Sequence, residues 1–206
     1  MYDTMPGATR ESLRETIMEC ERVGHAKGLA AGLSTALAAA GATDPPGRIA
    51  ALPTDQVPEG AAVVPNAMAE QEGISFVRWP ESSAEPALDS LAVLLGAVRI
   101  GVTRNLMEHA VTHLSGRTSG GEPTVRKQLV LGAIADAMTA ADAARECLLV
   151  DGDVPAAVVD THDRLTELDW EATKLLGASG FITDSPARAG YVSRLAANCW
   201  VPRGDT

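Results

Sequence analysis

Prolines divide this chain of 206 residues into segments that must fold differently. Seven of the twelve prolines lie between residues 41 and 87, and an α-helix does not persist through prolines at that spacing. Two pieces of this stretch, AAVVP and ISFVRW, have the residue types of short strands. We therefore expect residues 41–86 to be a linker with one or two short strands. Its large apolar side chains should pack against the rest of the protein, namely those of Val63, Val64, Phe76 and Trp79.

The segments on either side have helical periodicity. Apolar residues recur at helical spacing from Thr9 to Ala40 and predict one helix there, although Gly28 and Gly32 weaken it. Four helices are predicted after the linker, over about 87–115, 123–149, 155–176 and from Pro186 onward, with Pro123 and Pro155 in first turns. The first of these should bear one apolar stripe, formed by Leu88, Leu91, Leu95, Val98, Val102, Leu106 and Ala110.

These segments predict a mainly all-α fold. Long helices joined by short turns make an antiparallel four-helix bundle, which we assign to residues 87–206. The helix within residues 1–40 is expected to pack on this bundle, and residues 41–86 form the linker. Only 3% of the residues are aromatic while 46% are hydrophobic, so the core should consist of closely packed Ala, Leu and Val.

The charge balance excludes some classes of partner. The net charge of −10 provides no basic footprint for nucleic acid. No apolar run reaches the length expected of a membrane span, and the polar start MYDTMPGATRE does not resemble a secretory signal.

The three cysteines, Cys20, Cys147 and Cys199, are far apart and in no metal-ligand spacing, as expected of reduced thiols in a cytoplasmic protein. Arginine outnumbers lysine by 14 to 3, which with abundant Ala and Gly indicates a GC-rich genome.

The segment RTSGGEPTVRKQLVLGAIAD places an Arg and a Gln around a short turn between two predicted helices. Glycines allow a backbone to approach a pyrophosphate, and a guanidinium offers phosphate a fixed fork of donors. The alternative is that Arg117 and Gln128 only satisfy carbonyl groups of the turn. A second turn, KLLGASGFITDSPARAGY, lies between the third and fourth helices of the predicted bundle.

In order and separation these turns resemble the carboxyl-terminal helical domain of the acyl-CoA dehydrogenase family, over about residues 87–200. Five residues match the family's first turn: Arg117, Gly121, Pro123, Gln128 and Asp136. Five match its second, Gln-x-x-Gly-Gly-x-Gly-aromatic turn and the helix after it: Gly177, Gly180, Phe181, Pro186 and Tyr191. The segment ECERVGHAKGLAAGLSTALAA resembles a helix of the family's amino-terminal domain. The resemblance implies a homodimer in which Arg117, Gln128, Gly177 and Gly180 would hold FAD at a subunit interface.

The sequence also departs from the family in the parts that perform dehydrogenation. The β-rich domain that covers the family's flavin has only residues 41–87 in its place, too few for an independently stable sheet. Of the two positions for the family's catalytic Glu, one is Leu91, with Asp89 facing another side of the helix, and the other falls in NCWVPRGDT, which has none. The second turn has Lys174 for its Gln and Ala178 for a Gly. We therefore expect no cofactor, with FAD as the alternative.

Other titratable residues give weaker signals. His109 and His113 have metal-ligand spacing on one helix, but no third ligand is evident, so we expect no metal site. His162 is expected in a solvated first turn, although a role as a base is open. Glu167, Glu171 and Lys174 fit a solvated helix face with local ion pairs. No nucleophile elbow, phosphate loop or dinucleotide fingerprint is present.

These observations support two classes of function. In the first, a non-redox enzyme retains the apolar cleft of a dehydrogenase-like fold, walled by Leu33, Leu37, Leu91, Leu95 and Val98. Such a cleft suits a cyclisation, rearrangement or pericyclic reaction of a hydrophobic, polyketide-like acyl substrate in secondary metabolism, because holding the reacting ends together lowers the barrier by several kcal/mol. In the second, the protein is an oxidoreductase subunit that shares FAD across a dimer or with a full-length partner. A purely interacting subunit is a third possibility, and fold alone does not choose among them.

Overall fold

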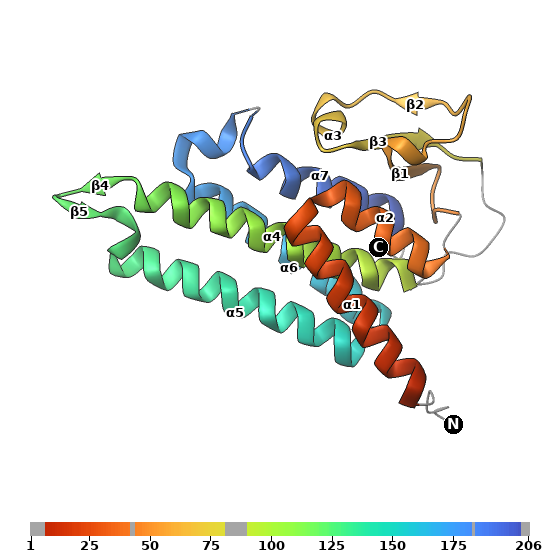
Figure 1. Cartoon of the computed structure of the whole chain (residues 1–206), viewed down its shortest axis with the longest axis horizontal. Helices are drawn as coiled ribbons and strands as arrows, with labels where there is room; N and C mark the ends of the chain where they lie inside the picture. Colours follow the sequence, from red (N-terminus) through yellow and green to blue (C-terminus); the bar gives the residue numbers. More distant parts are fainter. Residues whose placement is uncertain (1–6, 42–43, 81–89, 183, 203–206) are drawn as a thin grey trace.

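Helix α4, Ser90–Ser115, runs through the middle of the protein (Figure 1). The computed structural model describes residues 7–41, 44–80, 90–182 and 184–202, with side chains from residue 11 onward. Every residue from Leu91 to Thr103 is buried, and helices α1, α2, α5, α6 and α7 all pack against α4. The prediction of a single apolar stripe is therefore wrong, because every side of this helix has a neighbour. Leu88 lies outside the described residues.

The predicted helix over residues 9–40 is two helices, α1, Gly7–Lys27, and α2, Leu29–Ala40. The break is at Gly28, where a φ of 83° is not helical and is readily adopted only by glycine. Helix α2 therefore leaves the direction of α1 and packs on both α1 and α4. A periodic apolar pattern that continues across a glycine does not reveal such a change of direction.

The bundle after residue 90 consists of α4 followed by α5, Gln128–Asp151, α6, Pro155–Leu175, and α7, Ala187–Trp200. The mainly α fold with successive antiparallel helices is confirmed, as is Pro155 in the first turn of α6. Pro123 is not in a helix. It lies in a hairpin of β4, Thr118–Ser119, and β5, Glu122–Pro123, which is followed by the 3₁₀ helix η2, Thr124–Arg126. Helix α5 therefore starts five residues after the predicted first-turn proline, at Gln128.

The Pro-rich segment, predicted to be a linker with one or two short strands, forms a three-stranded antiparallel sheet. The strand order is β1, Ile49–Pro53, then β3, Ile74–Arg78, then β2, Val63–Val64, with the short helix α3, Ala67–Gln71, before β3. Pro53 ends β1, a position where its missing N–H costs no hydrogen bond inside the sheet. Sequence reasoning found β2 and β3 but missed β1, whose IAALP has weak strand character.

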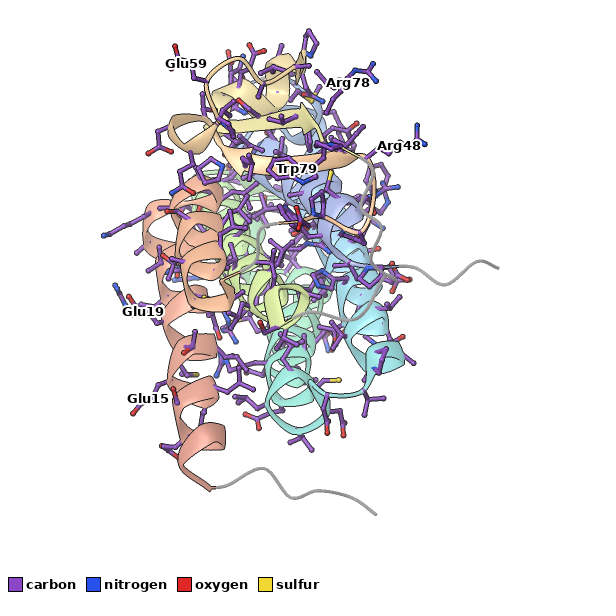
Figure 2. All side chains as sticks on the ribbon, turned by 90° about the vertical axis from the view of Figure 1, so that its right-hand side faces the viewer. Glu15, Glu19, Arg48, Glu59, Arg78 and Trp79 are labelled. Atoms are coloured by element: carbon purple, nitrogen blue, oxygen red, sulfur yellow. The ribbon has the colours of Figure 1, made fainter. Side chains whose placement is uncertain are left out.

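The sheet covers one end of the bundle, where β1 packs on α2 and α7 (Figure 1). Its link to α7 is specific, because Nε1 of Trp200 donates to the carbonyl oxygen of Ala51 at 2.8 Å. Figure 2 shows Arg48 and Arg78 pointing outward at one edge of the sheet and Trp79 on its inner side, while Glu15 and Glu19 point away from α1. Phe76 is buried as expected, whereas Val63 is exposed.

Residues from all three predicted segments, 1–40, 41–86 and 87–206, belong to one hydrophobic core. Within the described residues, α4 is also the one helix long and apolar enough to cross a membrane, contrary to the expectation that no run reaches that length. Of its most apolar stretch, 83% is buried inside the protein, as in the core helix of a soluble fold.

Helices α1 and α4 approach each other most closely at Gly101. A Cβ atom at this position would lie 2.2 Å from the carbonyl oxygen of Glu21 and 2.6 Å from the amide nitrogen of His25. Both atoms belong to the backbone of α1, so no side-chain movement could relieve the overlap. Any larger residue at 101 would have to push α1 away from the core.

We expect Gly101→Ala to lower the free energy of unfolding by at least about 1–3 kcal/mol, the cost of overpacking a core. The matched control is Gly132→Ala, because Gly132 lies in α5 and its Cβ would meet no atom within 4 Å. That substitution should raise stability by about 0.5–1 kcal/mol through helix propensity alone. Denaturant unfolding at low protein concentration measures both, and a neutral Gly101→Ala would contradict the close packing of α1 on α4.

Candidate small-molecule site between α6 and α7

A cavity of about 510 Å³ lies between α6, the 3₁₀ helix η3, Gly177–Phe181, and α7. Its walls are mostly apolar, and three of the few aromatic residues of the chain face it: Trp170, Phe181 and Tyr191. The Trp170 and Phe181 rings pack edge to face with centroids 5.4 Å apart. Trp170 is 55% exposed and Phe181 57%, unusual for residues of this size. An exposed aromatic wall around a cavity is typical of a site that binds an apolar molecule.

Asp169 provides the polar group of this cavity. Its residue is only 7% exposed, yet it lines the cavity. Oδ1 accepts a hydrogen bond of 2.7 Å from the Thr103 hydroxyl. Oδ2 accepts no hydrogen bond from any described residue and lies 3.6 Å from Nη2 of Arg99. Burial raises the pKa of the Asp169 carboxyl, while the charge of Arg99 and the Thr103 hydrogen bond act in the opposite direction.

Arg99 fixes α6 and α7 around this carboxyl. Its guanidinium is 1% exposed and donates from Nη1 to the carbonyl oxygen of His162 at 2.8 Å and from Nη2 to the Thr166 hydroxyl at 3.0 Å. Nε donates to Oγ of Ser193, in α7, at 3.2 Å. A buried guanidinium is tolerated only when its donors have partners, so this one holds three helices in register.

His162 completes the buried polar network, and the expectation of a solvated position is wrong because it is 0% exposed. Its Nε2 lies 2.9 Å from the carbonyl oxygen of Ala92, which can only accept, so Nε2 carries the proton. Nδ1 then accepts from Nη1 of Arg99 at 3.1 Å. The His162 ring therefore has a structural role, because it connects Arg99 to the backbone of α4. It does not line the cavity.

Sequence reasoning missed Arg99 and Asp169, although one signal was present. Asp169 follows Leu165 by four residues and precedes Ala172 by three, so it sits on the apolar stripe of α6, where a solvated carboxylate is not expected. Its close neighbour on α7 is Gly190, at which a Cβ would lie 2.9 Å from Cγ of Asp169. The small residue lets α7 approach the carboxyl.

A larger cavity, about 700 Å³, lies between α1, α4 and α5. Its charged residues bind one another: Glu21 lies 2.9 Å from Nε of Arg104 and 2.7 Å from Nε of Arg145. Asp142 binds both arginines, and the hydrogen bond from Arg104 lowers its pKa. These ion pairs tie the three helices together, so we assign this cavity a structural role.

The apolar cleft predicted from the sequence is filled. Leu33, Leu91, Leu95 and Val98 are at most 1% exposed, and Leu37 is half-buried. All five belong to the packed core and none lines any of the cavities described here. The correction has a simple physical reason: periodicity identifies the face of a helix that turns inward, but not whether the space it faces is filled.

The four residues that the resemblance assigned to FAD are spread over two turns. Arg117 and Gln128 are exposed at the two ends of the β4–β5 hairpin region, and Nη1 of Arg117 lies 3.1 Å from Nε2 of His113. Gly177 opens η3 with a φ of 60°, and Gly180 is buried and lines the cavity with Asp169. Arg117, Gln128 and Gly177 line none of the described cavities. Within one chain these residues therefore do not form a cradle that fits a flavin.

The other titratable residues singled out in the sequence, and the three cysteines, lie as follows. His109 and His113 line a hollow of about 370 Å³ beside Asp184, and the described residues contain no group of three His, Cys, Asp or Glu side chains that could hold a metal. Lys174 binds Glu171 at 2.6 Å, the local ion pair expected. Glu167 instead lines the Asp169 cavity. The three cysteines are free thiols.

No family model and no curated protein sequence matches this chain. Solved structures do. Butyryl-CoA dehydrogenase from Megasphaera elsdenii is 14% identical with a TM-score of 0.54, and the match covers 77% of this chain and 46% of that one. A chain in the structure of the electron transferring flavoprotein of Acidaminococcus fermentans is 16% identical with a TM-score of 0.52, covering 68% and 47%. FkbI, for biosynthesis of the methoxymalonyl extender unit of the FK520 polyketide immunosuppressant, is 20% identical with a TM-score of 0.50, covering 68% and 48%.

The matches therefore span less than half the length of each of these three structures. At such identities they describe the fold alone. Over the greater part of its described residues, this chain has a divergent acyl-CoA dehydrogenase-like fold.

Proposed function

We propose that this protein is a non-redox enzyme that binds an apolar, acyl-type small molecule between α6 and α7 and rearranges or cyclises it. The observation that carries the proposal is Asp169, a buried carboxyl with a raised pKa in the wall of an aromatic cavity. A carboxyl in a cleft whose pKa is shifted by burial and by a specific charged neighbour is a candidate for proton chemistry. This cavity replaces the cleft expected around Leu91.

The aromatic wall supports binding and folding of the substrate chain. About 510 Å³ is within the range of small-molecule pockets, and Trp170, Phe181 and Tyr191 offer flat apolar surfaces for a flexible chain. Holding two parts of one chain in contact removes entropy from the reaction barrier, worth up to several kcal/mol. A polyketide-like acyl chain is the substrate class that fits such walls.

Asp169 supports acid–base chemistry without an electron acceptor. A carboxyl with a raised pKa keeps its proton to a higher pH than an ordinary Asp, as a general acid requires. In the proposed cycle Asp169 gives its proton to a carbonyl oxygen or a double bond of the substrate. A new bond forms within the substrate, and the carboxylate takes a proton back from carbon. Substrate and product are then isomers, and no hydride leaves.

We expect Asp169→Asn to lower the rate of proton transfer by about 10²–10⁴-fold, the usual contribution of a general acid. The assay is incorporation of deuterium from D2O into unsaturated and 3-oxo acids, followed by mass spectrometry. Because the substitution leaves Arg99 without its nearby carboxylate, circular dichroism must first confirm that the variant is folded. A folded Asp169→Asn protein with full exchange activity would refute the proposal.

Thr103→Val provides a second test that depends on charge rather than on shape. The Thr103 hydroxyl stabilises the ionised form of Asp169, so its removal should raise the pKa of that carboxyl further. Exchange that needs protonated Asp169 is lost as the pH rises through this pKa. The alkaline limb of the pH–rate profile should therefore move to higher pH in the variant, whereas a purely structural Asp169 would leave the profile unmoved.

Activity should not depend on added flavin, nicotinamide or metal. The reasons are the Leu at position 91 and the Lys174 and Ala178 departures from the second turn of the family. Exchange is to be measured before and after exhaustive removal of flavin from the purified protein. Activity that disappears with the flavin and returns in proportion to added FAD would favour the alternative, a dehydrogenase-type subunit that uses Arg117 and Gln128 across an interface.

We also propose a homodimer formed through the amino-terminal half of α5. No residue between Gln128 and Asp136 is buried, and Leu129 is 89% exposed and Leu131 52%. Two leucines that are two residues apart point to different sides of a helix, so this part of α5 exposes a broad apolar surface, as is characteristic of an interface. Leu129→Lys with Leu131→Lys should weaken association about 100-fold or more, from about 1.5–3 kcal/mol for each leucine that the interface buries.

Light scattering over a range of concentrations measures this association. The matched control is Val150→Lys. Val150 is an apolar residue of α5 that is likewise exposed, at 69%, but it lies near the carboxyl-terminal end of that helix. The control should remain a dimer. A wild-type protein that is monomeric at micromolar concentration would contradict the homodimer.

A further inference from the structure

We infer that the cavity between α6 and α7 takes an apolar carboxylic acid of about eight carbons, with its carboxylate at Arg194 and its tail at η3. The inference rests on the proposed function and names the substrate class of the same site. It follows from the order of the lining residues along two antiparallel helices and from the one lining arginine that has no partner within the described chain.

The lining residues form three levels along the cavity. At one end Thr173 of α6 lies against Gly180 of η3, where a Cβ would come within 2.4 Å of the Thr173 carbonyl oxygen. In the middle Asp169 faces Gly190. Both α6 and α7 then continue away from η3, to Thr166 and Arg194 respectively.

At the end of the cavity away from η3, Arg99 shows that α6 and α7 are close together. It donates to Thr166 on α6 and to Ser193, the residue before Arg194, on α7. The cavity thus has an apolar end beside Phe181 and Ile182, an acid in its middle and a charged end at Arg194. A ligand that matches this sequence is apolar at one end and charged at the other.

Arg194 is the cation available to that ligand. Arg188 also lines the cavity, but its Nε binds Oε1 of Glu72 at 2.7 Å. Arg194 makes no hydrogen bond or ion pair with any residue in the described part of the chain, and it is exposed. A guanidinium presents two parallel donors to a carboxylate, so an acid is the group that it binds best. Glu167, exposed at the same end, weakens this attraction without pairing with Arg194.

The spacing of the levels sets the length of the acid. Thr166 and Thr173 are seven residues apart on α6, which at 1.5 Å per residue is roughly 10 Å. With carbon–carbon bonds of about 1.5 Å, a zigzag chain of roughly eight carbons covers that distance. Asp169 is three residues from Thr166, roughly 4.5 Å along the helix. The carbon that receives the proton therefore lies three or four carbons from the carboxylate.

The test compares octanoate with 1-octanol by titration calorimetry, with Trp170 fluorescence as the local reporter. We expect octanoate to bind at least 10-fold more tightly than 1-octanol and more tightly than butanoate or hexadecanoate. Arg194→Gln should remove the preference for octanoate and leave 1-octanol unchanged. Glu167→Gln should increase the affinity for octanoate. The matched control is Arg164→Gln, an exposed α6 arginine that pairs with Asp160 and does not line the cavity.

Each other outcome has a definite meaning. If octanoate and 1-octanol bind equally well, and Arg194→Gln changes the affinity of neither, the inferred substrate class is wrong but the proposed function stands. No binding of either compound, with all variants folded, overturns the proposed function as well. Octanoate binding without a Trp170 response places the acid elsewhere and overturns the inference. Tighter binding of 2-aminooctanoate that Glu167→Gln removes would overturn it in favour of an amino acid.

Discussion

The burial of Arg99 is the constraint on which the rest of this structure depends. An ionised guanidinium in a packed core costs several kcal/mol unless each of its donors has a partner and its charge is balanced. Here the partners come from α6 and α7, and the nearest carboxyl group is that of Asp169. The two helices cannot slide along α4 without breaking these bonds. Their separation, and hence the cavity between them, is fixed by one side chain.

The same bonds explain why the cavity differs from the rest of the interior. At Gly101, by contrast, α4 meets the backbone of α1 directly and no space remains between the two helices. Around Arg99 the polar atoms of three helices face one another, and the cavity opens beside them, where Thr166 and Asp169 line it. The carboxyl of Asp169 belongs to both environments, because it lies beside Arg99 on one side and borders the cavity on the other.

Local sequence signals predicted what depends on neighbouring residues. The class of the fold, the order of the helices and the first turn of α6 follow from periodicity and from Pro155. The break at Gly28 and the strand IAALP could not be predicted, because each is stabilised by contacts with distant segments. The candidate cleft around Leu91 failed for a related reason, since burial and an open cavity produce the same pattern. Asp169 had a local signal on its helix, but its partner Arg99 lies 70 residues earlier in the chain.

The bond between Trp200 and Ala51 joins residues 149 positions apart. The strands of residues 49–78 are made before α7, so their contact with α7 must wait until Trp200 has left the ribosome. Until then the part of β1 that packs on α7 lacks this cover. Contacts of such long sequence separation slow folding and prolong the exposure of apolar surface. Until α7 docks, the nascent chain is therefore more prone to aggregation than the folded protein.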